Sequence, residues 1–125
     1  MSTVGQIAGL TETYLLGQRV TCLQPKNGFR VAIDAVLLAA AVPARPGQRT
    51  MDVGCGSGAA ALCLAARIDG VHVTGLERQS DLAELARRNA VLSGLAARVD
   101  VVYGDLLDPP DGVGEAAFDH VFANP

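Results

Sequence analysis

The stretch Thr50-Met-Asp-Val-Gly-Cys-Gly-Ser-Gly58 decides the fold of this chain of 125 residues, and it runs directly into the alanine-rich segment Ala59–Arg67. The pattern predicts a strand, a tight turn and a helix. Glycines at 54, 56 and 58 leave the turn without side chains, so a ligand can lie against its backbone. Unpaired N–H groups at the start of the helix would point at that ligand. We therefore favour a cofactor site over a plain strand–helix turn.

Apolar segments and turn signals alternate along the rest of the chain. Further strands are predicted at residues 71–77, 98–103 and 118–123, and helices at residues 59–68 and 80–92. Strands that alternate with helices form parallel sheets through right-handed crossovers. The expected fold class is therefore α/β, with a Rossmann-like doubly wound parallel sheet that stops after its fourth core strand.

The region ahead of the central strand is predicted to begin with a hairpin. A Pro-Lys-Asn-Gly turn at residues 25–28 would join a strand at residues 19–24 to a returning strand at residues 29–31. With the helix that follows, this hairpin forms a short N-terminal extension, residues 1–48. The remainder, residues 49–125, is then the cofactor-binding part.

The helix of this extension is predicted over residues 33–42, and Pro43 ends it. Asp34 falls in its first turn, where a carboxylate suits the helix dipole. The face expected to be buried carries Ile33, Val36, Leu37 and Ala40.

Three carboxylates follow three of the predicted strands. Asp52, Glu77 and Asp105 each stand at or just past the carboxyl end of a strand. In open α/β sheets, ligands bind in the crevice outside that edge. Each acid alone fits a surface or turn residue about equally well. Because all three are in register with the glycine turn, we expect them to line one rim.

Asn124-Pro125 ends the last predicted strand at the same rim. A residue before proline is held extended, which fixes the direction of the Asn124 side chain. Its amide oxygen can accept a hydrogen bond from a substrate amino group, and a nearby backbone carbonyl can accept a second. Two such acceptors favour a more tetrahedral nitrogen and free its lone pair without a strong base. Taken alone, an Asn-Pro turn that closes a strand is the simpler interpretation.

The glycine turn resembles the first motif of class I methyltransferases, which bind S-adenosylmethionine, because it reads D-x-G-x-G-x-G from Asp52. This resemblance implies that Asp52 holds the methionine ammonium, Glu77 the ribose hydroxyls and Asp105 the adenine amino group. Leu106 would supply a backbone N–H and an apolar contact. The full set of implied cofactor-binding residues is Asp52, Gly54, Cys55, Gly56, Gly58, Glu77, Arg78, Asp105 and Leu106. Cys55 is interpreted as a small turn residue rather than a nucleophile.

The glycines also fit a relaxed NAD fingerprint, so an NAD-linked oxidoreductase is an alternative. Asn124-Pro125, however, resembles the first half of the N-P-P-[Tyr/Phe] motif of amino-group methyltransferases, which act on adenine or on glutamine amide. Both residues are therefore the implied catalytic residues. The chain stops before the second proline and the aromatic residue of that motif.

Residues 24–30, Gln-Pro-Lys-Asn-Gly-Phe-Arg, and the string from Asp34 resemble the bacterial tRNA adenine methyltransferases that modify position 37 of valine tRNA. The likeness runs from about residue 11 to residue 125. It implies that Lys26 and Arg30 bind RNA phosphate and that Asp34 lies near the methionine end of the cofactor. The expected function is methylation of the exocyclic amine of an adenine in tRNA.

Two other functions stay open. A protein glutamine methyltransferase shares the fold and the Asn-Pro pair, and a non-catalytic binding module would keep the fold alone. A complete class I methyltransferase has seven strands, whereas this sequence predicts four core strands. We therefore expect a fragment that binds its cofactor weakly, if at all, and does not turn over.

Composition limits the partners and the compartment. The formal net charge is −3 and 50% of the residues are hydrophobic, so no strongly basic surface is available and an RNA partner needs a local patch. Cys22, Cys55 and Cys63 form no C-x-x-C pair, which indicates neither zinc nor disulfides and suits a reducing cytoplasm. No signal-peptide pattern is present, and the longest apolar run, residues 35–42, is too short to span a membrane.

Overall fold

The computed structural model describes residues 9–25, 29–111, 113 and 118–124, with the side chains of residues 29–32 left out. Its centre is a four-stranded sheet whose strands are all parallel and lie in the order β5-β4-β3-β6. The strands are β3 (Arg49–Val53), β4 (His72–Glu77), β5 (Val99–Tyr103) and β6 (His120–Ala123). The predicted α/β fold with parallel strands is therefore confirmed.

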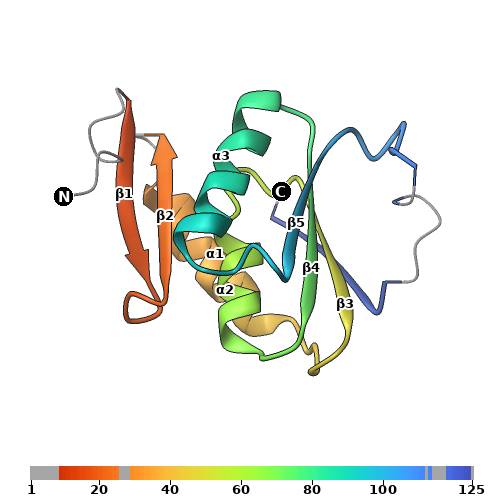
Figure 1. Ribbon diagram of the computed structural model, residues 1–125, viewed down its shortest axis with the longest axis horizontal. Helices are drawn as coiled ribbons and strands as arrows, with labels where there is room; N and C mark the ends of the chain where they lie inside the picture. The colour runs from red at the N-terminus through yellow and green to blue at the C-terminus, as the bar shows by residue number, and fades with distance from the viewer. Residues whose placement is uncertain (1–8, 26–28, 112, 114–117, 125) are drawn as a thin grey trace.

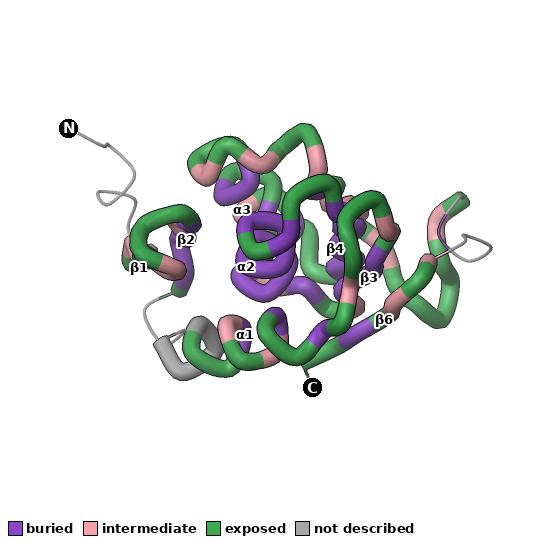
Figure 2. Tube along the Cα trace, turned by 90° about the horizontal axis from the view of Figure 1, so that it is seen from below, coloured by how far each residue is buried: buried purple, intermediate pink, exposed green. Residues whose placement is uncertain are grey.

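Three helices lie on the same face of this sheet (Figure 1). They are α1 (Phe29–Ala41), α2 (Ala59–Arg67) and α3 (Ser80–Leu92). Helix α2 is the most enclosed, with every residue except Arg67 buried, and Figure 2 shows it at the centre, between the sheet, the other two helices and the N-terminal strands. Its five alanines let neighbouring elements approach closely on all sides.

The N-terminal hairpin is present and its predicted strand at residues 19–24 is confirmed, but the partner strand lies before it in the chain rather than after it. Strands β1 (Leu10–Leu15) and β2 (Val20–Pro25) pair antiparallel. The predicted returning strand at residues 29–31 is wrong, because those residues begin α1. The actual turn has positive φ at Leu16 (52°) and Gln18 (69°), which the sequence does not signal. Of the predicted turn at residues 25–28, Pro25 is the last residue of β2, and residues 26–28 lie outside the described residues.

The predicted buried face of α1 is also wrong, except at Val36, which is partly buried against the core. Ile33 and Leu37 are 50% and 65% exposed, whereas Ala35 and Ala39 are buried against the core around α2. Because two alanine-rich surfaces can pack more closely than surfaces carrying large side chains, the helix turns its small residues inward.

The opposite face of the sheet carries a much smaller core. Met51, Leu76 and Val113 are buried there, with Phe118 packed against them, and the segment after β5 runs across this side (Figure 1). Strand β6 lies at one edge of the sheet. All three helices and the larger core therefore lie on one side of the sheet.

Candidate active site

The glycine turn between β3 and α2 is left-handed at three positions. Gly54, Gly56 and Gly58 have φ of 71°, 56° and 90°, which side chains strongly disfavour. The N–H groups of Gly54 and Cys55 both donate to the carbonyl oxygen of Leu76, at 2.7 and 3.1 Å. A Cβ added at Gly54 or Gly56 would meet no atom within 4 Å. The turn is therefore anchored to β4, with open space beside its backbone.

Cys55 packs against β4. A Cβ placed on Gly75 would lie 2.8 Å from the sulfur of Cys55 and 3.0 Å from its Cβ, so this strand position needs glycine. Burial, and after it the charges of Asp52 and Glu77, raise the pKa of the Cys55 thiol far above its ordinary value. A thiol that stays protonated is a poor nucleophile, which supports its interpretation as a turn residue.

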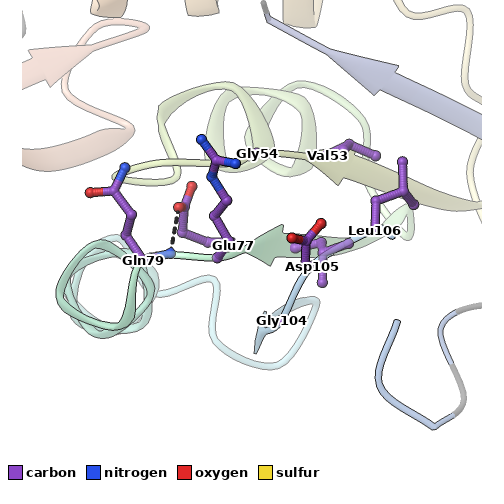
Figure 3. A pocket seen from close by; sticks show the side chains of 9 residues that line it. Val53, Gly54, Glu77, Gln79, Gly104, Asp105 and Leu106 are labelled. Atoms are coloured by element: carbon purple, nitrogen blue, oxygen red, sulfur yellow. Dashed lines mark hydrogen bonds between the residues drawn. The ribbon is translucent and has the colours of Figure 1, made fainter. Parts of the chain in front are cut away.

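A cavity of about 340 Å³ opens at the carboxyl ends of β3, β4 and β5 (Figure 3). It is lined by Val53, Gly54, Leu76, Glu77, Arg78, Gln79, Gly104, Asp105 and Leu106. The cavity thus unites predicted cofactor-binding residues from three separate strand ends.

Glu77 is buried beside this cavity, with 4% of its surface exposed. One carboxylate oxygen accepts a hydrogen bond from the N–H of Gly56 at 2.8 Å, and the other accepts one from the N–H of Gln79 at 2.9 Å. A carboxylate has about four lone-pair sites. Glu77 therefore holds the turn, and each of its oxygens has one further acceptor position.

Asp105 and Leu106 lie across the cavity from Glu77 (Figure 3). The Asp105 carboxylate accepts a hydrogen bond from the backbone N–H two residues later, at 3.0 Å, so it also shapes the turn. A Cβ on Gly104 would lie 2.5 Å from Cγ of Pro110. The proline ring therefore rests directly on the glycine, and this contact positions the loop that forms the wall.

A second cavity of about 80 Å³ adjoins the turn and shares Gly54 with the first. It is lined by Ala35, Asp52, Gly54, Cys55, Gly56, Ser57, Ala59, Ala60 and Asn124. The parallel pairing of β3 with β6 brings Asp52 and Asn124 together although they are far apart in the sequence. The predicted donor-binding acid and the predicted catalytic amide therefore line one cavity.

Asp52 is 2% exposed. Burial, helped by the charge of Glu77, raises the pKa of its carboxyl group from 3.8 to about 7, and a hydrogen bond with the backbone of Ala61 offsets part of this rise. At neutral pH the group is poised between its two protonation states. A cation placed in the small cavity would draw it toward the carboxylate.

Among the predicted site residues that the structure describes, Asp34 and Gly58 line neither of these two cavities. Asp34 is exposed on α1. Lys26 and Pro125 lie outside the described residues, and the side chain of Arg30 is likewise not described. Gly58 is the residue before α2, as predicted.

Sequence reasoning missed several residues of the walls. Gln79 contributes its backbone N–H to Glu77, and Ala35 reaches the small cavity from α1. Gln79 acts through its backbone and Ala35 has only a methyl group, so neither residue type predicts a place in the site. Ser57 could have been found, because it lies within the glycine stretch itself.

Two classes of feature are absent from the part of the chain that the structure describes. No group of three or more His, Cys, Asp or Glu side chains there could hold a metal ion. Among the same residues, no helix has the length and apolar character needed to cross a membrane.

Comparison with known proteins decides the family. Residues 50–125 match the family described as "Methyltransferase domain", which covers more than half of the chain. The chain belongs to this methyltransferase family. Its glycine turn, the larger cavity and the described end of β6 fall inside the matched region, as does the lining of the smaller cavity apart from Ala35.

Two relatives of this methyltransferase carry the same name, tRNA1(Val) (adenine(37)-N6)-methyltransferase. The relative from Porphyromonas gingivalis (strain ATCC 33277) is 37% identical over 103 residues, which cover 78% of this chain and 40% of the relative. The relative from Klebsiella pneumoniae is 36% identical over 97 residues, covering 66% and 40%. The methyltransferase chain therefore spans about two fifths of the length of these relatives.

Solved structures agree with the fold. A predicted O-methyltransferase from Agrobacterium tumefaciens matches with a TM-score of 0.62 at 36% identity, covering 73% of this methyltransferase chain and 48% of its own. A methyltransferase from Thiobacillus denitrificans, solved with S-adenosyl-L-homocysteine, matches with a TM-score of 0.59 at 27% identity, covering 73% and 35%. The Rossmann-like class I methyltransferase fold is thus confirmed for this chain.

Proposed function

We propose that this chain is the donor-binding part of a methyltransferase that methylates the exocyclic amine of an adenine in tRNA, in the cytoplasm. One observation carries the proposal: Asp52 and Asn124 line a small cavity at the glycine turn, while Glu77 and Asp105 line the larger cavity that adjoins it. Because the chain spans about two fifths of its curated relatives, the activity of the whole protein is part of the proposal.

The cofactor is S-adenosylmethionine, and the described residues fit it. The left-handed, side-chain-free turn leaves backbone accessible, and the buried carboxylate of Glu77 retains acceptor positions for a ribose. Asp105 and Leu106 would hold the adenine, and Asp52 the methionine ammonium. When bound, the cofactor supplies an electrophilic methyl group on its sulfonium sulfur. The family assignment favours this donor over the dinucleotide that the relaxed glycine pattern also allows.

Asn124 is the proposed catalytic residue, with Pro125 fixing its backbone. Its side chain reaches the small cavity from the exposed end of β6. There the amide oxygen would accept a hydrogen bond from the target amine, hold it in line with the methyl group and keep its lone pair available. Lys26, Arg30 and Asp34 are proposed to contact the RNA or the methionine end, as the resemblance of their segments implies.

Calorimetry with S-adenosylhomocysteine tests the donor site on the purified chain. We expect weak but saturable one-to-one binding and no binding of NADH under the same conditions. Binding of NADH without S-adenosylhomocysteine would overturn the assignment.

Because we expect no turnover by this chain alone, the acceptor is tested in the whole protein with tritium-labelled S-adenosylmethionine, bulk tRNA and a peptide that contains an acceptor glutamine. Label in N6-methyladenosine after nuclease digestion supports the proposal, and label in the peptide supports the glutamine alternative. Asn124→Ala should lower transfer about 100-fold while S-adenosylhomocysteine affinity stays within about threefold of wild type, because the amide acts on the acceptor. A parallel loss of affinity would show that Asn124 serves the donor instead.

A further inference from the structure

Asn89 is a fully buried polar side chain near the C-terminal end of α3, with no surface exposed to solvent. A buried amide is costly unless its donors and acceptor are paired. Each of its polar atoms is paired here, and the partners come from two segments far away in the sequence.

The first partner is strand β2 of the N-terminal hairpin. The N–H of Leu23 donates to Oδ1 of Asn89 at 2.8 Å, and Nδ2 of Asn89 donates to the carbonyl oxygen of Leu23 at 2.9 Å. The amide thus pairs with both backbone groups of one residue, as a neighbouring strand would. This contact fixes the position of β2 along α3.

The second partner is the glycine turn. The same Nδ2 donates to the carbonyl oxygen of Ser57 at 2.8 Å. The thiol of Cys22 lies 3.5 Å from Nδ2 and 3.6 Å from the hydroxyl of Ser57, so it fills the space between the hairpin and the turn. Ser57 lies between two left-handed glycines. The hydrogen bond from the Asn89 side chain to its carbonyl oxygen therefore restrains the conformation of the turn.

Ser93, one helical turn along α3, makes a matched contact that lacks the second partner. Its hydroxyl accepts a hydrogen bond from the N–H of Thr21 and donates to the carbonyl oxygen of Thr21, both at 3.0 Å. Ser93 therefore ties β2 to α3 in the same manner as Asn89. No hydrogen bond joins its side chain to the glycine turn among the described residues.

We infer that Asn89 is a positioning residue of the donor site, which holds the glycine turn through Ser57 and couples it to the N-terminal hairpin through Leu23. A ligand that orders the turn must then also order β2 at Leu23, because coupling between sites is reciprocal. The inference rests on the proposed donor site only in taking the turn as the place where the ligand binds.

Hydrogen exchange without ligand gives the first test, with Asn89→Asp compared against Ser93→Ala. The aspartate keeps the acceptor for Leu23 but loses the donors to Leu23 and Ser57. We expect the hydrogen-bonded amides of the turn, Gly54 and Gly58, to exchange about tenfold faster in Asn89→Asp, in line with the loss of one buried hydrogen bond. They should stay within about twofold of wild type in Ser93→Ala. Equal effects of the two substitutions would overturn the inference.

Calorimetry with S-adenosylhomocysteine gives the second test, with about a tenfold loss of affinity expected for Asn89→Asp and less than twofold for Ser93→Ala. In wild type, the ligand should slow exchange at the N–H of Leu23 more than at that of Thr21, a readout that needs no variant. Similar protection of both amides would contradict the coupling. Should wild type bind no S-adenosylhomocysteine, the donor site itself would be refuted, while the ligand-free exchange would still decide the role of Asn89. Asn89→Ser replaces Asn89→Asp if the buried acid prevents folding.

Discussion

The carboxylate of Glu77 accepts a hydrogen bond of 2.8 Å from the backbone N–H of Gly56. The side chain that we propose to bind the ribose therefore also holds the turn against which the ligand would lie. One buried side chain thus links the shape of the turn to the charge of the larger cavity, so its replacement should affect both.

Replacing Glu77 with glutamine should lower the affinity for S-adenosylhomocysteine about 10- to 100-fold, because hydrogen bonds to a charged group contribute about 1.5–3 kcal/mol each. Calorimetry at one temperature and buffer measures this loss. Glu84→Gln is the matched control, since Glu84 is an exposed carboxylate of α3 that contacts Arg87 and lines neither cavity of the donor site. Equal affinities of wild type and Glu77→Gln would remove Glu77 from the site.

The stability of the chain should fall as pH rises because of Asp52. Its pKa is about 7 in the folded chain and 3.8 is its ordinary value, so between these values the folded state binds one proton more than the unfolded state. The stabilisation that Asp52 contributes is therefore fully present below about pH 4 and is lost as pH rises through 7. Above that pH, the unfolding free energy no longer depends on this group. Asp52→Asn should reduce this decline by a few kcal/mol. Urea unfolding across that range measures it, and parallel curves for wild type and variant would contradict the prediction.

Gly75→Ala should disturb the glycine turn, because the new Cβ would lie 2.8 Å from the sulfur of Cys55. Overpacking of this kind costs about 1–3 kcal/mol of unfolding free energy. Cys55→Gly removes both clashing atoms. In the Cys55→Gly background, the further substitution Gly75→Ala should therefore lower the unfolding free energy much less than it does in wild type. A double-mutant cycle from urea unfolding gives the coupling, and additive effects would show that the two positions do not press on each other.

Arg98 should stabilise the C-terminal end of α2, whereas an exposed arginine such as Arg45 should contribute little. Its guanidinium donates to the carbonyl oxygens of Ala65, Ile68 and Val71 at 2.8, 3.2 and 3.0 Å. Arg98→Lys cannot span three acceptors, and we expect it to lower the unfolding free energy by about 2 kcal/mol. Arg45→Lys, at an exposed position, should change it by less than about 0.5 kcal/mol. Similar values for the two substitutions would show that the three hydrogen bonds of Arg98 do not contribute to stability.

Much of the sheet and its ligand edge could be predicted from the sequence, because both depend on local signals. Glycines mark the turn after β3, and the acids Asp52, Glu77 and Asp105 stand where apolar strands end. Parallel pairing then brings those strand ends to one rim. The meeting of Asp52 with Asn124 follows from the same rule, since β6 pairs with β3.

The parts that could not be predicted depend on tertiary packing. Large apolar residues at helical spacing indicated that Ile33 and Leu37 face the core, but the close fit of α1 on the alanine-rich α2 turns Ala35 and Ala39 inward instead. The hairpin turn uses left-handed residues other than glycine, which no local rule anticipates. The role of Asn89 likewise depends on partners from two distant segments of the chain, which no local pattern indicates.

The walls of the two cavities are packed against hydrophobic cores of unequal size. The smaller cavity stands against the extensive core around α2, whereas the loop that walls the larger one leans on Met51, Leu76 and Val113 together with the contact of Pro110 on Gly104. We therefore expect the proposed donor site to select unequally among analogues of the methyl donor. Bulky changes to the purine ring should be tolerated, because the loop can shift, whereas small changes to the amino-acid tail should prevent binding, because the wall of the smaller cavity is rigid.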